Sequence, residues 1–118
     1  LRYQNVYGAG QSLSNPYTGI LSIFSREMLA GRDVEIFEDG EESRDFVHVL
    51  DVARANVAAL EASADGAVLN VGSGERTSVL EIARRLAANY GFGGRTVVSG
   101  RFRAGDIRHN CADVSALE

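Results

Sequence analysis

The sequence predicts an α/β fold with a small mixed sheet and about three helices. Apolar residues recur at helical spacing in three segments, which begin near residues 18, 51 and 78. Short apolar runs typical of strands stand between these segments, and glycine-bearing turns separate them. Because strands and helices alternate along the chain, they are expected to pack in layers. A length of 118 residues gives room for one domain with one core.

The first elements are a strand and a helix. Residues 1–6 predict a short strand, which Gly8 and Gly10 end. Residues 18–30 carry Ile20, Leu21, Phe24 and Met28 at helical spacing. Gly31 then stands where a C-terminal helix cap belongs. We therefore expect a helix that ends at this glycine.

The middle of the chain predicts two strands and a second helix. Residues 34–37 alternate as a strand does, residues 38–41 indicate a turn, and residues 46–49 form a second short apolar run. Asp51 can cap the following helix, and Asp65-Gly66 closes it. The apolar face expected for this helix consists of Val52, Ala53, Val57 and Leu60.

The last third predicts strand, helix and strand. Residues 68–71 read as a strand that ends in the glycine-bearing turn 72–74. Ser78 and Glu81 have the spacing of a capping box, in which each side chain satisfies a backbone donor of the other. A final strand is expected near residues 96–99. The buried stripe of the third helix is expected to be Val79, Ile82, Ala83, Leu86 and Tyr90.

Composition argues against several classes of protein. The formal net charge of −4 disfavours sequence-independent binding to nucleic acid, which needs a cationic excess. One cysteine, Cys111, cannot form an internal disulfide, and two distant histidines give no zinc spacing, so we expect no metal and a cytoplasmic setting. No run approaches the roughly 18 apolar residues of a membrane span. Leu1 falls inside a predicted strand, so a fragment or excised domain is expected.

Two polar residues stand near predicted strands. Asn5 lies at the carboxyl end of the first strand, where open α/β sheets usually place ligands, and its amide can bond a phosphate or a sugar hydroxyl. An asparagine that satisfies turn backbone is an equally good interpretation. Arg44 can present a planar fork of donors to a phosphate. A surface ion pair with Asp45 or Glu42 is somewhat more usual for such an arginine.

Three further segments raise functional questions. Arg103, a glycine and Asp106 suit a nucleoside diphosphate, with the arginine on phosphate and the aspartate either on ribose hydroxyls or orienting the arginine. Loops of this composition are also common without a ligand. Residues 72–74 lack the spacing of a dinucleotide loop and the lysine of a P-loop, so they predict a tight turn. His48 lies in an apolar run and is more typical of a packed strand residue than of an acid or base.

Four segments carry motifs of one family in that family's order. They are residues 1–11, residues 43–52, residues 70–74 and residues 103–113. Together they resemble the C-terminal, substrate-binding portion of extended short-chain dehydrogenase/reductases, the NAD-dependent epimerases and dehydratases of nucleotide sugars. Ala9 replaces the usual proline, and Leu50 stands where aspartate is frequent. Four ordered motifs over nearly the whole chain are far more specific than any one of them.

The resemblance implies roles for matching residues. One group would bind the diphosphate, sugar and ribose, and a second would line the base pocket. A third would close over the nucleotide from the start of a helix, where free backbone donors favour an anion. One residue would approach the nicotinamide end of NAD through its backbone. The residues for the diphosphate, sugar and ribose are Asn5, Arg44, Arg103 and Asp106, and those for the base are Glu35, Ile36 and Phe37. The residues at the start of the helix are Gly19, Ile20 and Leu21, and the residue near the nicotinamide is Gln4.

The family's hydride-transfer residues do not occur in this sequence. No tyrosine has a lysine four residues later, and all 12 Lys+Arg residues are arginines. The resemblance therefore implies that residues 1–118 are the substrate-binding part of a 4-epimerase of UDP- or dTDP-hexoses, inactive alone. NAD would be held mainly by an upstream Rossmann part. The resemblance also leaves a homodimer open as the assembly. Residues 11–19 most resemble 4-epimerases of deoxysugar nucleotides. The competing hypothesis is a non-catalytic module of the same family that binds nucleotide, RNA or protein.

Overall fold

The computed structural model describes residues 1–15, 19–62 and 66–117. Three helices and eight short strands are assigned within these residues, which confirms the mixed α/β class. The helices are α1 (Ile20–Leu29), α2 (Val49–Glu61) and α3 (Val79–Tyr90). The strands are β1 (Arg2–Tyr3), β2 (Asn5–Tyr7), β3 (Val34–Ile36), β4 (Ser43–Arg44), β5 (Phe46–His48), β6 (Asn70–Val71), β7 (Thr77–Ser78) and β8 (Thr96–Val98).

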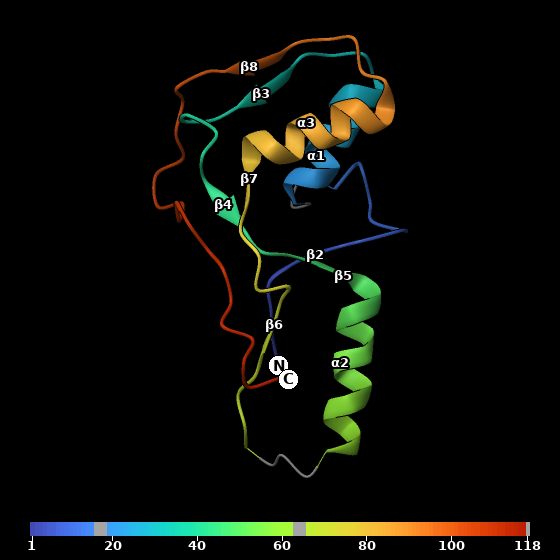
Figure 1. The fold of residues 1–118 in the computed structure, drawn as a ribbon. Coiled ribbons are helices and arrows are strands. Elements are labelled where there is room, and N and C mark those ends of the chain that lie inside the picture. Colours follow the sequence, from blue (N-terminus) through green and yellow to red (C-terminus); the bar gives the residue numbers. More distant parts are fainter. Residues whose placement is uncertain (16–18, 63–65, 118) are drawn as a thin grey trace.

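The molecule is elongated and has two ends of different construction. Its principal extents are 50 × 28 × 23 Å, and its radius of gyration is 16.0 Å, against about 13 Å for a compact domain of 100 residues. Figure 1 shows α1, α3, β3 and β8 together at one end, here termed the pocket region. The other end, termed the α2 region, holds β1, β2, β5, α2 and β6, with both chain termini close to it (Figure 1).

The strands pair in twos across long stretches of sequence. β1 pairs with β6, β2 with β5 and β3 with β8, all parallel, while β4 and β7 are antiparallel. The single strand expected at residues 1–6 is two strands, because the chain changes partner at Gln4. The polar strands β4 and β7 were not predicted from sequence, since they carry no apolar alternation to reveal them.

The pocket region encloses the larger core. Strand alternation buries Val34 and Ile36 completely, and α1 and α3 cover them with apolar stripes at the expected spacing. The expected burial of Tyr90 is wrong, because this residue is 44% exposed in the last turn of α3. Gly91 follows in a left-handed conformation, and Phe92 packs against the core beyond it. The chain reversal thus places Phe92 where the helical pattern had placed Tyr90.

Helix α2 begins earlier and faces differently than predicted. His48, not Asp51, is its N-cap, since the His48 side chain accepts a hydrogen bond from the backbone N–H of Leu50. The buried face consists of Val52 and Ala55, which pack beside Val47 and Val71. Ala53, Val57 and Leu60, which were expected to be buried, are largely exposed. Apolar spacing fits two overlapping faces of this helix, and only one meets β5. Asp65, expected to close the helix, lies outside the described residues.

Helix α3 has the N-cap that the sequence predicts. The Ser78 hydroxyl accepts a hydrogen bond from the backbone N–H of Glu81 at 3.2 Å. The Glu81 carboxylate instead accepts from Arg85 one turn later, at 2.7 Å, so only half of the capping box forms among the described residues. Within that part of the chain, no helix is both long and apolar enough to cross a lipid bilayer.

Candidate functional site

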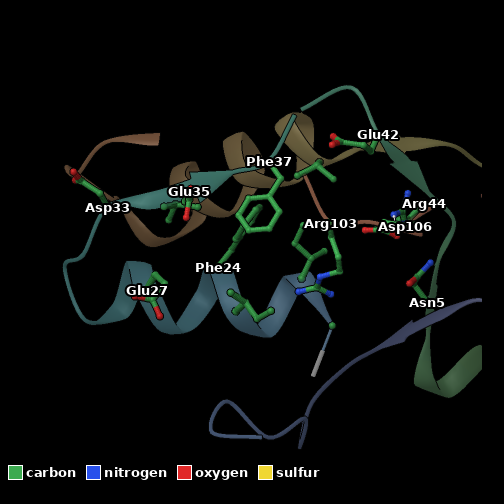
Figure 2. A pocket seen from close by; sticks show the side chains of 15 residues that line it. Asn5, Phe24, Glu27, Asp33, Glu35, Phe37, Glu42, Arg44, Arg103 and Asp106 are labelled. Atoms are coloured by element: carbon green, nitrogen blue, oxygen red, sulfur yellow. Dashed lines mark hydrogen bonds and ion pairs between the residues drawn. The ribbon is translucent and has the colours of Figure 1, made fainter. Parts of the chain in front are cut away.

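A cavity of about 530 Å³ opens between α1, β3, β4 and residues 103–106. This volume lies in the range of small-molecule sites. Figure 2 shows side chains from these separate segments converging on it. Eight of the residues assigned by the family resemblance line the cavity: Asn5, Gly19, Ile20, Glu35, Phe37, Arg44, Arg103 and Asp106.

Three assigned residues lie elsewhere. The side chain of Ile36 is fully buried in the core, whereas its neighbours Glu35 and Phe37 line the cavity. Leu21 packs against the same core from α1. Gln4 lies beside Gly72, and its Oε1 atom is buried with no hydrogen-bond partner among the described residues.

One end of the cavity is cationic. Arg44 is held in place by three hydrogen bonds, from Nη1 to the carbonyls of Ser43 and Arg108 and from Nη2 to Asp106 Oδ1 at 2.9 Å. Asp106 therefore fixes Arg44 and not Arg103, the arginine that the sequence had suggested it would orient. Arg103 lines the cavity and is exposed, and its guanidinium has no hydrogen bond or ion pair within the described chain. A fixed arginine beside an unpaired one suits a doubly charged anion.

Asn5 reaches the same end of the cavity from β2. Its amide nitrogen donates at 3.3 Å to the carbonyl of Asp45, 40 residues away in the chain, so Asn5 lines the cavity and does not satisfy the backbone of a local turn. Figure 2 shows Asn5 beside Arg44 and Asp106.

The rest of the cavity is apolar, and three of its carboxylates, Glu27, Asp33 and Glu35, are already paired with arginines. Phe37, Phe24 and Ile20 belong to an apolar wall that Ile23, Val34 and Val79 complete. Hydrogen bonds from Arg32 and Arg26 lower the pKa of Glu27 to about 2, and those from Arg95 lower the pKa of Asp33. No Ser, Cys, His, Lys or Tyr occurs among the described lining residues. The arrangement suits binding of a ligand with a flat apolar part and an anionic part.

Asp45 follows Arg44 and connects this segment to residues 73, 74 and 112 without lining the cavity. Sequence reasoning treated it only as an ion-pair partner. Its buried carboxylate accepts hydrogen bonds from Ser73 N and Oγ (both 2.7 Å), Gly74 N (3.1 Å) and Ala112 N (3.2 Å). Burial alone would raise the pKa of Asp45, but these donors outweigh it and hold the pKa below its usual value. A side chain at Gly72 would collide with this carboxylate. The chain bends at Gly72 and Gly74, and the backbone N–H groups of Ser73 and Gly74 point to Asp45.

Glu42 lines the cavity, and sequence reasoning considered it only as an ion-pair partner of Arg44. It is 7% exposed, and its Oε2 atom has no partner among the described residues. Its ligand atom lies within 4.8 Å of those of Glu38 and Asp39, a spacing that would admit a metal ion. Arg108 bridges Glu38 and Asp39 at 2.8 and 2.7 Å, so a guanidinium already neutralises much of this cluster. The one feature of the sequence that pointed to Glu42 was its position two residues before Arg44.

Comparison with known proteins gives a consistent result. A model of the NAD dependent epimerase/dehydratase family matches residues 1–72. The chain is 47% identical to the dTDP-L-rhamnose 4-epimerase of Burkholderia thailandensis over 98% of its own length and 32% of that protein. It is similar to the solved structure of the UDP-glucose 4-epimerase of Thermotoga maritima with UDP-glucose, with a TM-score of 0.89 and 39% identity over 98% of this chain and 36% of that one. It is also similar to the structure of the UDP-N-acetylglucosamine 4-epimerase of Methanobrevibacter ruminantium with UDP-N-acetylmuramic acid, with a TM-score of 0.91 and 33% identity over 98% of this chain and 37% of that one. The chain spans about a third of the length of the curated relatives it matches.

Proposed function

Because the chain belongs to the NAD-dependent epimerase/dehydratase family, we propose that it is the nucleotide-sugar-binding part of a 4-epimerase acting on UDP- or dTDP-hexoses. The observation that carries this proposal is the pair of arginines at one end of the cavity. Arg44 is fixed by Asp106, while Arg103 lines the same cavity and its guanidinium has no partner among the described residues. The named activities of the relatives, 4-epimerases of dTDP- and UDP-sugars, support the choice of ligand.

In this proposal the nucleotide lies along the cavity. The base packs on the apolar wall at Phe37, and the diphosphate meets Arg44 and Arg103 through bidentate, charge-assisted hydrogen bonds. Asn5 contacts the diphosphate or the sugar next to it. Contacts at several points of the nucleotide restrict where the sugar can lie. Such positioning lowers the barrier of the reaction, because the reacting groups are already oriented.

The remaining parts of the proposal concern groups outside the cavity. NAD accepts and returns a hydride when bound, and an upstream Rossmann part would hold most of it. Gln4 would border the cofactor, since its buried Oε1 lacks a protein partner among the described residues and can accept a hydrogen bond. A cytoplasmic setting and a homodimer complete the proposal. One cysteine in the whole sequence supports a reducing compartment.

Calorimetric titration of the 118-residue chain with UDP tests the binding role. We expect weak binding that Arg103→Ala reduces about tenfold, because the variant loses a charge-assisted hydrogen bond to phosphate. Arg84→Ala is the matched control, since Arg84 is an exposed arginine of α3 that does not line the cavity. Unchanged affinity in Arg103→Ala would contradict the proposed contact.

Turnover tests the other half of the proposal. The purified chain with NAD and UDP- or dTDP-hexose is expected to show no epimerisation, because the sequence has no lysine for a tyrosine–lysine pair. Product measured by chromatography above a protein-free control would overturn this expectation.

A further inference from the structure

Arg101 lies just outside the cavity and takes no part in the proposed diphosphate contacts. Its guanidinium carbon is 5.5 Å from the centroid of the Phe37 ring, within range of a cation–π interaction. Phe37 lines the cavity, whereas Arg101 does not, so the arginine meets the ring from outside the cavity. Figure 2 shows the Phe37 ring projecting toward the cavity centre above Phe24.

A second contact fixes the guanidinium. Arg101 Nη1 lies 3.2 and 3.3 Å from the two carboxylate oxygens of Glu35. Glu35 and Phe37 flank the buried Ile36 and therefore lie on the same face of the chain. One arginine thus links the two side chains that β3 and its extension present to the cavity.

The backbone holds Arg101 at this place. Parallel pairing sets Val98 opposite Ile36, and the carbonyl of Arg101 accepts a hydrogen bond from Glu38 N at 2.7 Å. The side chain therefore starts from a fixed point beside Phe37, although it is 71% exposed. This arrangement restrains the ring before any ligand arrives.

We infer that Arg101 is a positioning residue for the nucleobase: it holds Phe37 as a preformed stacking platform, and so raises affinity for the base but not for the phosphates. This inference rests on the proposed function. A cation on one face of an aromatic ring leaves the other face for a flat ligand, and an immobilised ring loses less entropy on binding. Arg101 thus acts through Phe37, whereas Arg103 acts directly on the ligand.

The test compares UDP with inorganic pyrophosphate, which lacks the base. For Arg101→Met we expect the affinity for UDP to fall about threefold more than the affinity for pyrophosphate, the size of an exposed cation–π interaction. Loss of a positive charge alone would weaken both ligands equally. Arg101→Lys keeps a cation and is expected to restore part of the difference. Arg54→Met, which removes another exposed, ion-paired arginine far from the cavity, is the matched control.

Ultraviolet absorbance gives a second readout that a merely structural role would not move. Stacking on Phe37 should lower the absorbance of bound uracil, and this loss should be smaller in Arg101→Met. The chain has no tryptophan, so the nucleobase band is readily measured. Equal losses of affinity for UDP and pyrophosphate in Arg101→Met, or an unchanged affinity for UDP, would overturn the inference alone. A wild-type chain that binds neither ligand would overturn the proposed function and the inference with it.

Discussion

The two regions of the molecule bury their apolar residues to different degrees. Among the described residues, the pocket region has seven buried residues in one core, with eight partly buried side chains packed around it. In the α2 region, four buried residues have two such neighbours, and the outward face of α2 leaves Leu50, Val57 and Leu60 exposed. The cavity belongs to the better-packed region, whose core directly supports its apolar wall. A binding site needs a stiff wall more than it needs a uniformly packed molecule.

Asp45 connects three segments that are far apart in the sequence, and its removal should have the largest effect. We expect Asp45→Asn to lower the free energy of unfolding by about 3 kcal/mol or more, because the backbone donors of Ser73, Gly74 and Ala112 would compete for one amide oxygen at a buried side chain. Urea unfolding followed by circular dichroism measures the loss. Asp51→Asn, at an exposed carboxylate of α2, should cost far less. Equal losses of unfolding free energy in the two variants would contradict the connecting role of Asp45.

Two matched valines compare the cores directly. Val79 begins α3 in the pocket region and Val52 lies in the first turns of α2, with side chains exposed by 7% and 8%. Val79→Ala should cost about 2 kcal/mol, because a well-packed core relaxes little around the lost methyl groups. Val52→Ala should cost about 1 kcal/mol, since the smaller core is easier to collapse. Equal losses by urea unfolding would show that the two cores are equally constrained.

Acid should weaken the pocket region through Glu27. Hydrogen bonds from Arg32 (2.6 Å) and Arg26 (2.9 Å) lower the pKa of Glu27 from 4.5 to about 2. Because the folded pKa is below the unfolded one, this carboxylate stabilises the fold fully above pH 4.5 and loses that contribution as the pH falls toward 2.

Comparison of Glu27→Gln with the wild-type chain measures this contribution. The variant should be less stable by about 1 kcal/mol at neutral pH, as expected for partly exposed ion pairs, and the difference should vanish near pH 2. Glu61→Gln, at an exposed position ending α2, should give a curve parallel to the wild-type one. A difference between Glu27→Gln and wild type that does not depend on pH would argue against the ion pairs.

Sequence predicted more of the pocket region than of the α2 region. Helix α1, strand β3 and the cap at Ser78 follow from short-range patterns that the structure confirms. The face of α2 was predicted wrongly, because its apolar residues allow two faces and only long-range packing against β5 selects one.

The candidate site shows the same division. Most of its members came from motif resemblance, and eight of them converge on the cavity. The hydrogen bonds of Asp45 to residues 73, 74 and 112, and the contact of Arg101 with Phe37, join segments far apart in sequence. No local pattern encodes such contacts, so only the three-dimensional structure reveals them.

The smallest effect is expected on the outward face of α2. Leu60 is 87% exposed, so Leu60→Ser should change the free energy of unfolding by less than about 0.5 kcal/mol. Exposed apolar residues favour self-association, so the variant should also show less of it by analytical ultracentrifugation at high concentration. A loss above about 1 kcal/mol in urea unfolding would mean that this face is packed in solution. The contrast between the two regions would then lie only in the sizes of their cores, not in an uncovered helix face.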